Sequence, residues 1–346
     1  MKKFVWVIVI NAAVISLLTG CGADKEVQQT TDESDVLSIY TTIYPIAFFA
    51  SEIGGSHVEV ESILPAGSDP HTYEPTTKTM LEIAKADAFI YNGAQLETYA
   101  KKIGDALESE QVLMVEASEG IALLEHTNDE KEHQEDTDSH DEEDHSEDTH
   151  SHDEETQEDI DSHDDEEHLH DHEDADPHVW IDPIRSISLA ENIMKTLIEL
   201  KPEAEDEFLQ NFENLKTRLE ELDTDFHKLE TFQNKEILVT HAAYGYWESA
   251  YGLEQIAISG ISSTQEPSQK QLETIIDLVK EHDIRYLLFE QNIESKVADV
   301  IQAETEVESL NIHNLEVLTE EDINNDEDYF TLMYQNLDVL VKALQK

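Results

Sequence analysis

The chain has 346 residues, of which 80 are Asp or Glu and 21 are Lys or Arg, so its formal net charge is −59. A chain this acidic has no basic patch that could displace the counterions of phosphate, which excludes a nucleic-acid-binding function. A negative field favours cations as ligands but selects no particular cation. The length leaves room for two domains of ordinary size.

The first 20 residues have the pattern of a cleaved signal peptide. Two lysines precede the apolar run Phe4–Leu18, which is short for a membrane span and is followed by no stop-transfer pattern. The run ends in Leu-Thr-Gly-Cys21, which resembles a bacterial lipobox. We therefore expect a lipid on Cys21, followed by a flexible tether over residues 21–35; an ordinary secretory signal is the alternative. Cys21 is the only cysteine, so a tight metal site must use histidine and carboxylate.

Short apolar runs alternate with helical patterns from residue 36 onward, which is typical of a parallel sheet with crossover helices. The pattern predicts strands at Val36–Thr41, Val58–Leu64, Ala88–Asn92 and Val112–Val115, and helices at Thr77–Lys85 and Leu96–Leu107. We expect these elements to form an N-terminal α/β lobe over residues 36–201.

A tract at residues 125–176 interrupts this lobe. It carries ten histidines and 27 carboxylates against one lysine, with no aromatic residue. Such a composition buries no apolar surface, so we expect a disordered loop. Imidazole and carboxylate are ligands of borderline divalent metals, zinc above all. The tract predicts loose metal capture, and a merely solubilising linker is the alternative. Its candidate ligands are His140, His145, His150, His152, His163, His168, His170 and His172.

After the tract, a helical pattern at Ser186–Leu200 is followed by Pro202 and a second one, Glu203–Glu230, which would exceed about 40 Å. We expect a linking helix over residues 202–230 and a C-terminal α/β lobe over 231–346. The predicted strands there are Ile237–Thr240, Gln255–Ser259, Tyr286–Glu290 and Val307–Leu310, with helices at Gln269–His282 and Ser295–Thr305. The predicted fold is two parallel-sheet (β/α)4 lobes joined by one long rigid helix.

Four side chains are candidate metal ligands because each lies near the end of a predicted strand or in a Gly- or Pro-containing loop. They are His71 in Asp-Pro-His-Thr-Tyr, His178 in Asp-Pro-His-Val-Trp, His241 in Thr-His-Ala-Ala-Tyr, and Glu290 at the end of its strand. Ligands of open α/β sheets bind at the carboxyl ends of strands. Two ligands from each lobe would thus meet in the cleft between the lobes.

The other residues of interest have ordinary interpretations. Four histidines lie in charged or unremarkable surroundings and are expected at the surface: His57, His227, His282 and His313. Four aromatic residues near the candidate ligands are expected to pack around the strand ends: Tyr73, Trp180, Tyr244 and Trp247.

The segments around His71, His178, His241 and Glu290 resemble those of metal-specific solute-binding proteins of bacterial ABC importers. The resemblance covers residues from about 36 to 346 and implies two α/β lobes, a rigid bridging helix and a metal between the lobes. It carries these four residues over to the ligand positions of the family. Manganese receptors of the family place a carboxylate where His241 stands, and a His-rich acidic loop before the second histidine is typical of the zinc branch.

Three imidazoles and one carboxylate suit tetrahedral Zn²⁺, whereas manganese prefers more oxygen ligands. The expected function is therefore high-affinity capture of Zn²⁺ for a membrane ABC permease with its cytoplasmic ATPase. The expected location is the outer face of the bacterial cytoplasmic membrane, with the protein anchored through the lipid on Cys21 and monomeric.

Three alternatives stay open. The protein could be a receptor for manganese or another divalent metal, since copper would bind the same nitrogen set at least as tightly. It could be a surface adhesin of the same fold. The third alternative is an enzyme whose zinc is held by three histidines and a water. The chain has no HExxH sequence, and a carboxylate as fourth ligand would close the coordination sphere of the zinc. We therefore expect no enzymatic activity.

Overall fold

The structure is a computed structural model that describes residues 36–125, 175–292 and 296–345. The predicted signal peptide, Cys21 and the eight candidate histidines of the acidic tract lie outside the described residues. From Leu37 onward the described chain belongs to one compact unit.

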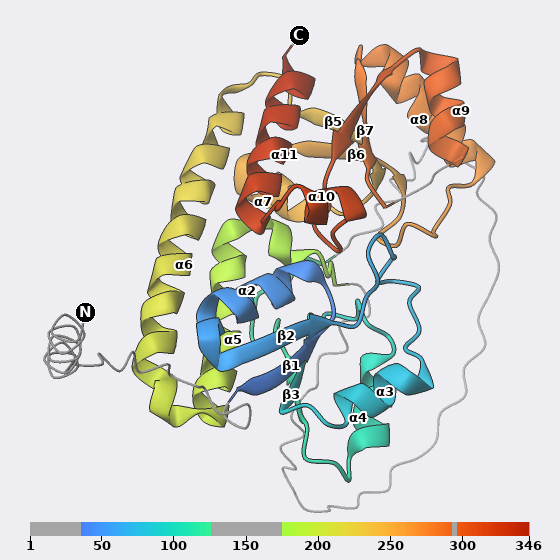
Figure 1. The fold of residues 1–346 in the computed structure, drawn as a ribbon. Helices are drawn as coiled ribbons and strands as arrows, with labels where there is room; N and C mark the ends of the chain where they lie inside the picture. The colour runs from blue at the N-terminus through green and yellow to red at the C-terminus, as the bar shows by residue number, and fades with distance from the viewer. Residues whose placement is uncertain (1–35, 126–174, 293–295, 346) are drawn as a thin grey trace, which may run out of the picture. The chain divides into compact units, whose positions relative to one another are not determined.

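The first sheet has four parallel strands in the order β2-β1-β3-β4 (Figure 1). Helix α2 packs against β1 and β2. The elements of this lobe are β1 (Leu37–Thr41), α2 (Tyr44–Gly54), the 3-10 turn η3 (Gly55–His57), β2 (Val58–Ser62), α3 (Thr77–Ile83), β3 (Ala88–Tyr91), α4 (Ala100–Leu107) and β4 (Leu113–Glu116).

The second sheet repeats this arrangement with the order β6-β5-β7-β8, again all parallel. Helices α8 and α9 lie on one side of it and α11 on the other (Figure 1). Its elements are β5 (Glu236–His241), α7 (Gly245–Tyr251), β6 (Glu254–Ser259), α8 (Gln269–Glu281), β7 (Tyr286–Glu290), α9 (Lys296–Thr305), β8 (Glu308–Ile312), α10 (Glu320–Asn324) and α11 (Tyr329–Leu344).

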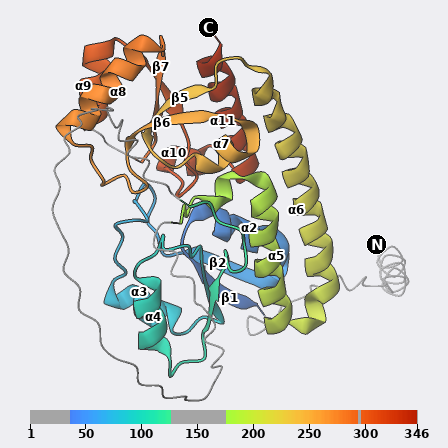
Figure 2. The same ribbon diagram turned by 180° about the vertical axis from the view of Figure 1, so that it is seen from behind.

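Two adjacent helices connect the sheets, and both views show them side by side (Figures 1 and 2). They are α5 (Pro183–Leu200) and α6 (Glu205–Phe226). The 3-10 turn η4 (Val179–Ile181) precedes α5, η5 (Pro202–Ala204) lies between the two helices, and η6 (His227–Thr231) follows α6. The Asp182 side chain caps α5 by accepting from the backbone N–H groups of Ile184 and Arg185. Helix α6 packs against α2, α5 and α11. It does so through buried residues spaced three or four apart: Phe208, Phe212, Leu215, Leu219, Leu222 and Phe226.

One hydrophobic core extends from the first sheet through these helices to the second. It includes Ile39 of β1, Leu219 of α6 and Leu288 of β7, none of which is exposed. Hydrogen bonds also join the lobes: the indole N–H of Trp247 donates to the carbonyl of Ile181 at 2.8 Å. A shared core and buried cross-links favour small lobe motions, because interiors packed this tightly resist deformation.

The predicted architecture of two parallel-sheet lobes is confirmed, and all eight predicted strands are present within two residues of their expected ends. Helix α4 begins at Ala100, later than expected, because Ala94 and Gln95 adopt positive φ angles of 50° and 64° in the preceding turn. Four helices were not predicted: α2, α7, α10 and α11. Among the described residues no helix is both long and apolar enough to cross a membrane.

Candidate metal centre

Four side chains, two from each lobe, meet between the lobes. His71 lies in the loop after β2, and His178 lies just before η4. His241 is the last residue of β5, and Glu316 follows β8 by four residues. These four, which we call the ligand cluster, each offer one ligand atom, and the four atoms lie within 4.8 Å of one another.

The spacing inside the ligand cluster suits a small tetrahedral cation. The Nε2 atoms of His178 and His241 are 3.3 Å apart. Glu316 Oε1 lies 3.5 Å from His71 Nε2, 3.8 Å from His178 Nε2 and 3.9 Å from His241 Nε2. Ligand atoms about 2.0–2.2 Å from a tetrahedral Zn²⁺ are separated by roughly 3.3–3.6 Å. The cluster is therefore close to the dimensions of such a site, with slight contraction needed.

The ligand cluster is buried and contains polar atoms that have no hydrogen-bond partner. His178 and His241 are fully buried, Glu316 is 1% exposed and His71 is half-buried. Two of the four inward-facing atoms, His71 Nε2 and Glu316 Oε1, are buried without a hydrogen-bond partner. Buried polar atoms are normally paired because an unmade hydrogen bond is costly. Two unpartnered atoms whose lone pairs can face one point are what a bound cation would satisfy.

Carboxylates behind two of the histidines fix the direction in which their rings point. Asp176 Oδ1 lies 2.8 Å from Nδ1 of His178. Glu290 Oε2 lies 2.5 Å from Nδ1 of His241, and its Oε1 accepts from the hydroxyl of Tyr244 at 3.1 Å. A carboxylate on Nδ1 directs Nε2 toward the other members of the cluster and raises the basicity of Nε2 as a metal ligand.

The fourth member of the ligand cluster is not the residue that the sequence predicted. Glu290 was expected to be a metal ligand, but its carboxylate lies on the Nδ1 side of His241, away from the Nε2 atoms of the cluster. Glu316 lies with the three histidines instead, because the turn after β8 brings its carboxylate to their Nε2 atoms. The three predicted histidines are brought together as expected.

The turn before Glu316 is tightly constructed. Leu315 is fully buried with a φ of 62°, a left-handed conformation that is unfavourable for a leucine. Its backbone N–H donates to Nδ1 of His313, and that of Glu316 donates to Oδ1 of Asn314. His313 was expected at the surface but is buried, with Nε2 3.2 Å from Asp322. A strained turn held by several side chains is consistent with a role in placing Glu316.

Opposite charges in the cluster stabilise one another. Burial opposes charge on the Glu316 carboxyl, but the three nearby histidines, His71 above all, outweigh it and lower its pKa to about 2. Burial likewise disfavours a charged His241, but the attraction and hydrogen bond of Glu290, together with Glu316, raise the pKa of His241 to about 9. In the metal-free cluster the Glu316 carboxylate is therefore ionised and the His241 imidazole is protonated. A metal that binds His241 must displace this proton.

The other described residues of interest lie elsewhere. His227 is exposed, while His57 and His282 are half-buried, and each contacts a carboxylate. Trp180, Tyr244 and Trp247 are fully buried and Tyr73 is half-buried, in line with their expected packing role.

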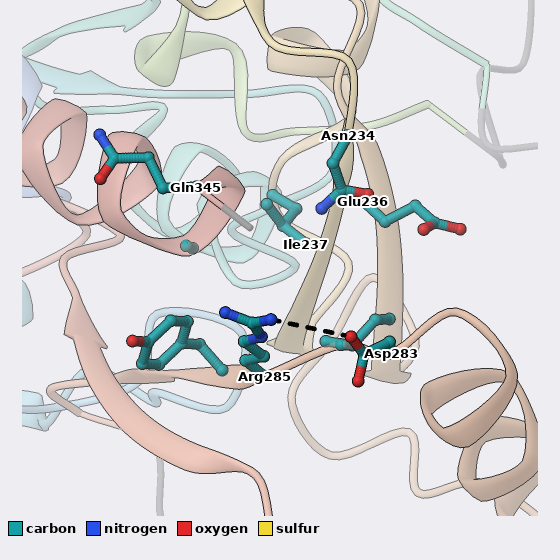
Figure 3. A pocket seen from close by; sticks show the side chains of 9 residues that line it. Asn234, Glu236, Ile237, Asp283, Arg285 and Gln345 are labelled. Atoms are coloured by element: carbon teal, nitrogen blue, oxygen red, sulfur yellow. Dashed lines mark ion pairs between the residues drawn. The ribbon is translucent and has the colours of Figure 1, made fainter.

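A small pocket at the opposite end of the second sheet offers no comparable chemistry. It is lined by residues that include Asn234, Glu236, Asp283 and Arg285, with one ion pair of 3.9 Å between Asp283 and Arg285 (Figure 3). Its volume of about 10 Å³ holds a single water at most. These residues lie at the amino ends of β5 and β7, whereas ligands of open α/β sheets bind at the carboxyl ends.

Comparison with known proteins gives a consistent picture. Residues 39–343 match the family model of ZnuA, described as zinc-uptake complex component A, periplasmic. The zinc-binding protein AdcA of Streptococcus pyogenes is 34% identical over 319 residues, which cover 90% of this chain and 58% of the relative. This chain thus spans 58% of the length of that relative. The high-affinity zinc uptake system protein ZnuA of Bacillus subtilis is 30% identical over 344 residues, covering 99% of this chain and 98% of the relative.

Among solved structures, the Zn(II)-bound ZnuA-like domain of Streptococcus pneumoniae AdcA has a TM-score of 0.68 and 29% sequence identity. The match covers 90% of this chain and all of that domain.

Proposed function

We propose, from the premise that this chain belongs to the family of zinc-uptake complex component A, that it captures Zn²⁺ outside the cytoplasm for import by a membrane permease. The single observation that carries the proposal is the ligand cluster. Three imidazole nitrogens and one carboxylate oxygen converge there, and two of these buried atoms have no hydrogen-bond partner. Similar proteins named for zinc binding and zinc uptake support zinc as the cargo.

Several features support a receptor for zinc over the alternatives. Four protein ligands would close a tetrahedral sphere, leaving no position for a substrate or an activated water as catalytic zinc sites have. Manganese favours a larger number of oxygen ligands than the single carboxylate in the cluster provides. The adhesin alternative stays a prediction.

We infer that cleavage before Cys21 leaves a lipid-anchored protein on the outer face of the cytoplasmic membrane, where it docks as a monomer on an ABC permease with a cytoplasmic ATPase. The lipobox-like sequence supports the anchor. The family description as a component of a zinc-uptake complex supports the permease.

Deleting residues 126–174 tests whether the cluster, rather than the acidic tract, is the high-affinity site. Glu125 and Ala175 already form an antiparallel bridge, so a short glycine link can rejoin them, and Asp176 keeps its contact with His178. We expect one tightly bound zinc to remain and several weak ones to disappear, because ordering a flexible tract on a metal costs entropy that a preformed site avoids. Metal content after dialysis and a chelator competition measure both classes.

The matched control keeps the tract and replaces His178 with alanine. This variant is expected to lose the tight zinc and retain the weak ones. Loss of the tightest zinc from the truncated protein, with retention in the His178→Ala variant, would place the high-affinity site in the tract and contradict the proposal.

Zinc affinity is also expected to fall with acid. Because the pKa of His241 is raised to about 9 in the metal-free protein, zinc must displace its proton at neutral pH. Affinity should fall about tenfold for each unit of pH between about pH 8 and pH 7, since one proton competes with one metal. The carboxyl of Glu316 stays ionised throughout this range because its pKa is lowered to about 2. Calorimetric titration in buffers of different ionisation enthalpy gives the number of protons released.

The exposed His227 provides the control for this experiment. His227→Ala should release the same number of protons on zinc binding as the unmodified protein. An affinity that is constant between about pH 8 and pH 6 would show that no imidazole proton competes with the metal in this range, and would contradict the raised pKa of His241.

A further inference from the structure

The two carboxylate oxygens of Glu316 have different surroundings. Oε1 faces the three Nε2 atoms and has no hydrogen-bond partner. Oε2 accepts two hydrogen bonds, both 3.0 Å long, from the side-chain amides of Asn292 and Asn314. Asn314 is fully buried and Asn292 half-buried. We call these two asparagines the amide clamp.

The hydrogen-bond network allows one orientation of each amide in the clamp. Oδ1 of Asn314 accepts from the backbone N–H of Glu316 at 3.2 Å and from Nε2 of Gln291 at 3.0 Å. A backbone N–H can only donate, so the NH₂ group of Asn314 must face Glu316 and Asn292. That NH₂ group also donates to Oδ1 of Asn292 at 3.0 Å, which turns the NH₂ group of Asn292 toward Oε2.

We propose that the amide clamp restricts Glu316 to a single ligand oxygen and so makes the centre selective for zinc over manganese. With Oε2 held by two donors, only Oε1 reaches the metal, and three imidazoles complete a sphere of four. Bidentate binding would need both oxygens on the metal, and Oε2 would then give up a lone pair that now accepts an N–H group of the clamp, which is costly. Zinc is commonly four-coordinate in proteins, whereas manganese prefers a larger number of oxygen ligands. The inference rests on the proposed function, since it concerns the same cluster.

The test replaces Asn292 with leucine, which has a similar size and no donor. Bound Co²⁺ serves as a probe, because its visible absorption is intense in four-coordinate sites and weaker in sites of higher coordination. We expect the unmodified protein to give the intense spectrum and Asn292→Leu a weaker one. In the same variant the affinity for manganese relative to zinc should rise about tenfold, because Oε2 loses one of its two donors and keeps only the hydrogen bond from Asn314. Chelator competition with each metal measures this ratio.

Asn192→Leu is the matched control. Asn192 is also half-buried and donates its amide to two acceptors, the carbonyls of Ala117 and Glu119, away from the cluster. Its spectrum and metal ratio should equal those of the unmodified protein. If Asn292→Leu does not fold, Asn292→Ala removes the same donor and is measured in its place.

An Asn292 variant with an unchanged Co²⁺ spectrum and a metal ratio within about twofold of the unmodified protein would overturn the inference. It would leave the proposed function intact provided that the unmodified protein binds zinc tightly. Failure of the unmodified protein to bind zinc at the cluster would overturn the proposed function, and the inference with it.

Discussion

Replacing Glu316 with glutamine is expected to weaken zinc binding by more than about 100-fold, and replacing Glu290 with glutamine by about 10- to 100-fold. The two carboxylates differ in what they touch. Glu316 Oε1 faces all three Nε2 atoms, whereas Glu290 contacts the far side of the His241 ring. Loss of a direct anionic ligand should therefore cost more than loss of a carboxylate that orients a ligand. Zinc dissociation constants from chelator competition give the order of the two effects.

Glu308→Gln is the control for this comparison, because Glu308 is an exposed carboxylate at the start of β8, the strand that leads to Glu316. Its affinity for zinc should match that of the unmodified protein. A larger loss in Glu290→Gln than in Glu316→Gln would restore the prediction from sequence that Glu290 is the ligand.

His241→Glu is expected to abolish tight zinc binding and to destabilise the metal-free protein by about 3–5 kcal/mol. The new carboxylate would lie between Glu290 and Glu316, which are 4% and 1% exposed. Glu290 would lose its ion pair with Nδ1 and face a like charge in a buried site, a situation that costs more than the loss of the pair alone. Urea unfolding of the metal-free protein measures the loss of stability.

The double variant His241→Glu, Glu290→Gln separates charge repulsion from the loss of the ligand. It should regain much of the stability while zinc binding stays weak, because the repulsion is relieved and the nitrogen donor is still missing. Tight zinc binding by His241→Glu alone, with unchanged stability, would mean that His241 is neither a ligand nor the partner of Glu290.

The amino-acid sequence predicts the sheets well because buried parallel strands are short, dense apolar runs. The run Ile237–Thr240 and the observed β5 (Glu236–His241) differ by one residue at each end. Helix α2 was missed for a different reason. It has apolar and aromatic residues on several sides, so the contrast between its buried and its exposed face is weak.

The three histidines of the ligand cluster could be predicted because each lies close to a strand end or in a loop containing proline. Glu290 satisfied the same rule, and its position at the end of β7 does bring it to the centre, but on the wrong side of His241. Glu316 also follows a strand, and applying the strand-end rule to β8 would have nominated it. The turn that directs it depends on the left-handed Leu315 and the side chain of Asn314, which leave no periodic pattern in the sequence.

A zinc-edge anomalous diffraction experiment on crystals of the zinc-loaded protein tests the assignment of the centre most directly. We expect one strong anomalous peak, about 2.0–2.2 Å from Nε2 of His71, His178 and His241 and from Oε1 of Glu316, with Glu290 still on Nδ1 of His241. A peak bonded to Glu290 in place of Glu316, or a strongest peak outside the four residues of the ligand cluster, would contradict the assignment.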